Sequence, residues 1–103
     1  MIPRPLWNVT PVKTADYHAV VGELVKVDPS GGVITVTLPD AIAAHGESVC
    51  VFDYGAASAT HNITVSTVHS QTITPSSAGT LSTNSIAKTY TSDGANWIVS
   101  VAS

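Results

Sequence analysis

Apolar and polar residues alternate through much of this chain, and the clearest example is VITVTLP at residues 33–39. Ile34, Val36 and Leu38 share one parity, and threonines stand between them. A period of two places the apolar side chains on one face of a strand and the threonines on the other. Pro39 has no amide hydrogen to donate to a neighbouring strand, so we expect the strand to end there.

Further strand signals follow the same reasoning. They lie at residues 20–27, 48–54, 63–74, 86–91 and 97–101. The segment DPSGG at 28–32 is a turn, because proline presets φ and glycine accepts positive φ. The segment SVCVFDY at 48–54 is apolar at both parities, which is typical of a central strand. Val68 falls out of phase with Ile63 and indicates a bulge or a sharp bend.

Strand signals recur roughly every 10 to 15 residues, which predicts an all-β fold: a small antiparallel β-sandwich or barrel-like domain. Composition agrees, because the chain has 14 Val, 7 Ile and 13 Thr but only 4 Leu. β-Branched residues fit a pleated sheet better than a helix. The one exception is DAIAAHG at 40–46, where Asp40 as N-cap and Gly46 as C′ residue favour a single helical turn.

Residues 1–16, MIPRPLWNVTPVKTAD, differ from the rest of the chain. Their prolines favour extended backbone, yet several positions are apolar, which is unusual for a free tail. We therefore divide the chain into an extended N-terminal arm, 1–16, and a β domain, 17–103. The predicted partner-binding residues of the arm, which would dock on another surface such as a neighbouring subunit, are Ile2, Pro3, Arg4, Pro5, Leu6 and Trp7. The alternative is an arm folded back on its own domain.

Charge excludes several classes of partner. Charged residues make up 11% of the chain, against roughly 25% in an average soluble domain. Such a surface suits tight contact with copies of itself or with a larger assembly, although a Thr-rich β domain with no such role has the same composition. The net charge is −3 and the four cationic side chains are scattered, which argues against nucleic-acid binding. No apolar run approaches the ~20 residues of a membrane span.

Few residues are candidates for metal binding or nucleophilic catalysis. His18, His45, His61 and His69 form no i, i+2 or i, i+4 pair and have no cysteine pair beside them, so we expect no metal site and no cofactor. Cys50 has apolar neighbours, which favour a buried thiol with a raised pKa over a nucleophile.

Other catalytic arrangements are also missing. No G-x-S-x-G segment is present, and most carboxylates stand in turn or cap contexts. We therefore predict that the chain is not an enzyme. Trp97, Tyr54, Tyr90 and Tyr17 are candidate stacking surfaces for a sugar. Trp97, however, opens an alternating apolar strand, which favours a role in the core or between subunits.

Three segments, taken in order, resemble a known module. They are VGELVKVDPSGGVITVTLPDA at 21–41, NITV at 62–65 and SDGANW at 92–97. This order is similar to that of a β module of bacteriophage tail fibres, head fibres and capsid decoration proteins, over roughly residues 17–101. The resemblance implies a small β module, commonly trimeric and without catalysis. Residues 68–71, VHSQ, depart from it, because such modules often have a glycine-rich turn there.

The resemblance implies a structural virion protein, and we expect a trimeric capsid decoration (cement) protein. It would bind the major capsid protein, stabilise the assembled head and lie on the capsid surface after synthesis in the host cytoplasm. The chain begins with Met, and we expect it to be complete at 103 residues, whereas a tail fibre joins such a module to a shaft. The alternatives are a tail-fibre or receptor-binding module that recognises host glycans, and a free-standing sugar-binding domain.

Overall fold

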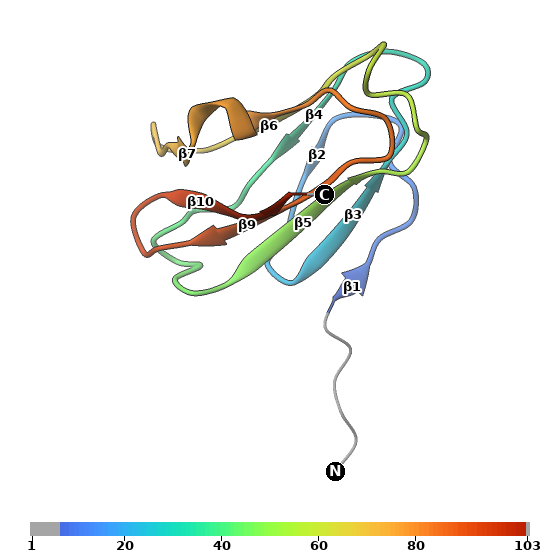
Figure 1. Ribbon diagram of the computed structural model, residues 1–103. Helices are drawn as coiled ribbons and strands as arrows, with labels where there is room; N and C mark the ends of the chain where they lie inside the picture. Colours follow the sequence, from blue (N-terminus) through green and yellow to red (C-terminus); the bar gives the residue numbers. More distant parts are fainter. Residues whose placement is uncertain (1–6, 103) are drawn as a thin grey trace.

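The computed structural model describes residues 7–102, with side chains up to Val99, and folds them into strands with a single short 3-10 turn (Figure 1). The elements are β1 (Asn8–Val9), β2 (Tyr17–His18), β3 (Glu23–Val27), β4 (Ile34–Thr37), β5 (Ser48–Asp53), β6 (Ile63–Ser66), β7 (Ile73–Thr74), η1 (Ser76–Gly79), β8 (Thr80–Leu81), β9 (Ala87–Ser92) and β10 (Trp97–Ala102). The mainly β character expected from the β-branched composition is confirmed.

The strands form two sheets. Sheet A has six strands in the order β1-β3-β5-β9-β10-β7, and sheet B has four in the order β2-β4-β6-β8. From β1 to β9, each successive strand therefore lies in the other sheet. Among the strands described, the chain crosses between the sheets after each strand up to β8, and only β9 and β10 are neighbours both in sequence and in a sheet.

This alternation corrects the expectation of antiparallel pairing. Five of the eight strand pairs are parallel: β1–β3, β3–β5, β2–β4, β4–β6 and β7–β10. The reason is geometric. In the four pairs among β1–β6 the chain turns back into the opposite sheet and then returns, so it runs again in its first direction beside the earlier strand. The β6–β8 pair is antiparallel, although β7 of the other sheet lies between the two strands in the sequence.

The turn at 28–32 reverses the chain without forming a hairpin, although such a turn sequence is typical of antiparallel hairpins. The turn is present, with the Gly32 N–H donating to the Pro29 carbonyl oxygen (3.0 Å) and the Ser30 N–H donating to Asp28 Oδ1 (3.0 Å). It joins β3 of sheet A to β4 of sheet B, so the two strands do not pair. Proline and glycine therefore mark a reversal of the chain here without making a hairpin.

Buried side chains from both sheets form one hydrophobic core. Ile34, Val36 and Leu38 are almost fully buried, as their alternation predicts. β5 lies in the middle of sheet A, and three consecutive residues of it, Val49–Val51, are buried, in agreement with the central strand expected there. The predicted helical turn at 40–46 is a series of tight turns closed by the Ala44 N–H donating to the Asp40 carbonyl oxygen (3.1 Å).

The predicted irregularity near Val68 is a bend. The chain leaves sheet B after Ser66 and enters sheet A at Ile73. Between them His69 and Ser70 have positive φ values of 54° and 58°, the left-handed region that non-glycine residues enter at some cost.

Candidate functional site

Of the predicted partner-binding residues, Trp7 alone belongs to the described part of the chain. Ile2, Pro3, Arg4, Pro5 and Leu6 lie outside the described residues. Trp7 is partly buried and stands directly before β1.

The residues after Trp7 lie along sheet A. The Asn8 N–H donates to the Gly22 carbonyl oxygen (2.8 Å), and the Lys13 N–H donates to that of Lys26 (2.8 Å). Lys13 in turn accepts from the Asp28 N–H (2.9 Å). The described part of the predicted arm therefore runs parallel to β3 and extends the sheet of its own domain.

A cluster of Lys13, Tyr17 and Glu23 joins the end of the segment at residues 8–17 to β3. The Tyr17 hydroxyl lies 2.9 Å from both carboxylate oxygens of Glu23, and the Lys13 ammonium lies 4.2 Å from the centroid of the Tyr17 ring. Burial, with the adjacent carboxylate, raises the pKa of Tyr17. The ring is thus already engaged by a cation, which leaves less of it for a ligand.

Two other candidate stacking residues belong to the core. Trp97 and Tyr90 each have an exposed fraction of 0%. The Tyr90 hydroxyl donates to the Ala78 carbonyl oxygen (2.6 Å), and burial raises the pKa of Tyr90. Of the two roles expected for Trp97, in the core or between subunits, the structure shows the first, and neither ring presents a face to a sugar.

Tyr54 is the exposed aromatic residue among the four candidates, with 54% of its surface accessible. The ring of Phe52 meets it edge-on at a centroid distance of 6.3 Å, and the Lys26 ammonium lies 4.9 Å from its centroid. Tyr54 follows directly after β5, at one end of sheet A.

A buried carboxylate organises the loops at that end. Asp53 accepts hydrogen bonds from the backbone N–H groups of Ala57 (3.2 Å), Ser58 (2.9 Å) and Ser85 (3.0 Å). Burial by itself would raise the pKa of Asp53, but these hydrogen bonds favour the ionised form, and the net pKa is lowered. All donors come from the protein's own loops, so Asp53 has a structural role.

The metal and nucleophile candidates can be placed as well. Within residues 7–102, no three His, Cys, Asp or Glu side chains gather in a way that could hold a metal ion. Cys50 is buried, as expected, and burial raises the pKa of its thiol. Neither observation points to catalysis.

One surface, the outer face of sheet A, was not predicted from the sequence. In β3 and β5 the buried core positions are Val25, Val27, Val49, Val51 and Asp53, so the intervening residues point away from the core. With their register partners on the flanking strands, the outer face consists of Val9, Leu24, Lys26, Ser48, Cys50, Phe52, Ala87, Thr89, Thr91 and Ile98. The segment SVCVFDY at 48–54 indicates this face, because its odd-numbered and even-numbered positions are both apolar. The same pattern also fits a central strand, which is the only feature predicted from it.

No family model matches this chain, and no curated protein matches it. None of the helical structure found between residues 7 and 102 is long and apolar enough to cross a membrane.

Proposed function

We propose that this chain is a non-enzymatic structural protein of a phage particle, a trimeric capsid decoration protein that binds the major capsid protein. In this proposal the domain is a small all-β sandwich, and the arm contacts the shell through residues 2–7, ahead of the stretch that pairs with β3. A protein that binds only the assembled shell stabilises it by mass action. A trimer matches the local three-fold positions of an icosahedral lattice.

The observation that supports this function most is the ordered set of motifs that resembles the virion module. Each motif occupies a defined element: residues 21–41 span β3, the crossing turn and β4, and residues 62–65 include most of β6. Residues 92–97 run from the last residue of β9 through the turn to the first residue of β10. There Asp93 Oδ1 accepts the backbone N–H groups of Ala95 (3.0 Å) and Asn96 (2.8 Å).

A glycan-binding tail module is the second candidate, and the exposure of Tyr54 favours it. An exposed aromatic ring at the end of a β domain can stack on the apolar face of a sugar. Tyr54→Ala would then abolish binding to host-cell glycans without changing the fold. Phe52→Ala, at the neighbouring aromatic residue, is the control for general surface hydrophobicity and should leave glycan binding unchanged.

Antibody labelling of purified virions of the phage that encodes the chain tests the location directly. Label distributed over the head supports a decoration protein, and label confined to the tail supports the glycan-binding alternative. Cosedimentation with heads that lack the protein then tests the arm. A variant without residues 2–6 should fold but fail to cosediment, and full binding by this variant would contradict a role for the arm.

A further inference from the structure

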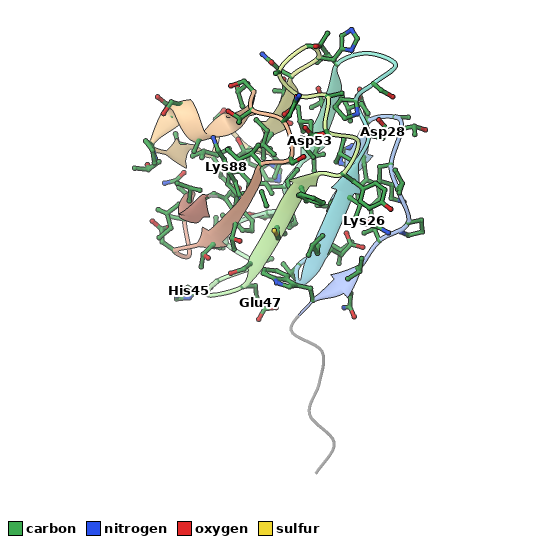
Figure 2. The ribbon with its side chains drawn as sticks, turned by 45° about the vertical axis from the view of Figure 1, so that its right-hand side comes forward. Lys26, Asp28, His45, Glu47, Asp53 and Lys88 are labelled. Atoms are coloured by element: carbon green, nitrogen blue, oxygen red, sulfur yellow. The ribbon has the colours of Figure 1, made fainter. Side chains whose placement is uncertain are left out.

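No further inference is drawn: the strongest candidate, the outer face of sheet A between the end of β3 and β5 that carries Asp28 and Asp53 and the opposite end that carries His45 and Glu47 (Figure 2), is only partly apolar, and nothing in the structure of residues 7–102 shows what covers it.

Discussion

The indole N–H of Trp97 donates to the backbone carbonyl oxygen of Pro39 over 3.2 Å, although 58 positions separate the two residues. This hydrogen bond joins the first residue of β10 in sheet A to the segment that follows β4 in sheet B. Trp97 is also fully buried. One side chain thus contributes both apolar packing and a polar link between the two sheets.

Trp97→Ala should therefore destabilise the domain strongly. Loss of the buried ring leaves a cavity and should lower the free energy of unfolding by about 3–5 kcal/mol. Trp97→Phe keeps most of the apolar volume but removes the N–H, and should cost roughly 1–2 kcal/mol. Urea unfolding measures both, and a change below about 1 kcal/mol for the alanine variant would contradict the core role.

Asp53→Asn tests the buried carboxylate. The amide retains the shape but not the charge, and should cost about 2 kcal/mol at neutral pH because charge-assisted hydrogen bonds are lost. The folded pKa of Asp53 is below its ordinary value. Its contribution to stability is therefore complete above the unfolded pKa of about 3.9 and is lost as the pH falls through the folded pKa.

Unfolding measured against pH checks this sign. Below about pH 4, stability of the wild-type protein should fall more steeply than that of Asp53→Asn. Asp40 and Asp93 also have lowered pKa values, Asp40 mainly through the Gln71 side chain and Asp93 through backbone N–H groups. Some acid sensitivity should thus persist in the variant. Parallel curves for the two proteins would show that Asp53 is not the titrating group.

Gly55→Ala should destabilise the turn region for steric reasons. A Cβ at Gly55 would lie 2.1 Å from Asp28 Oδ1 and 3.0 Å from the Asp28 Cα, so the two loops must separate. We expect a loss of about 1–3 kcal/mol. Gly31→Ala is the control, because nothing lies within 4 Å of its Cβ; thermal unfolding should show it neutral or slightly stabilised.

Thr10→Val tests whether the stretch before β2 belongs to the fold. Thr10 is buried; its hydroxyl oxygen accepts a hydrogen bond from the Lys26 N–H (3.2 Å), and its O–H donates to the Pro11 carbonyl oxygen (2.8 Å). Valine has nearly the same shape but no hydroxyl, so the variant should lose about 1–2 kcal/mol in chemical unfolding. The exposed Thr14, changed to valine, should have no effect. Equal stability of both variants would mean that this stretch contributes little.

Cys50 should react slowly with thiol reagents in the folded protein. Burial limits access and raises the pKa of its thiol, which lowers the fraction of thiolate. We expect modification by an aromatic disulfide reagent at mildly alkaline pH to be at least about tenfold slower than in guanidinium chloride. Equal rates under both conditions would place the thiol in solvent.

Sequence patterns predicted the local structure well. The alternation around Val36 gave the buried face of β4, and the apolar run through Cys50 gave the central strand β5. Turn residues also marked the reversal at 28–32. Local patterns report on which side chains are buried and where the chain turns, and these are properties of a few consecutive residues.

The arrangement of the strands could not be predicted in the same way. A turn sequence is compatible with a hairpin and with a crossing into a second sheet, because both reverse the chain. The pairings of Leu24 with Cys50 and of Ile34 with Ile63 join distant segments and depend on the whole fold. The outer face of sheet A was missed for the same reason, since its rows exist only once distant strands lie side by side.

The strict alternation of strands between the sheets also has a consequence for how the chain folds. Sequence neighbours pair only in the β9–β10 hairpin among the strands described, and every other pair joins segments far apart in the chain. Folds rich in such distant contacts have high contact order and fold on the millisecond-to-second scale. During synthesis, the first local hairpin becomes available only when residues 87–102 have left the ribosome, so we expect the domain to fold after translation of this segment, not progressively from its N-terminal end.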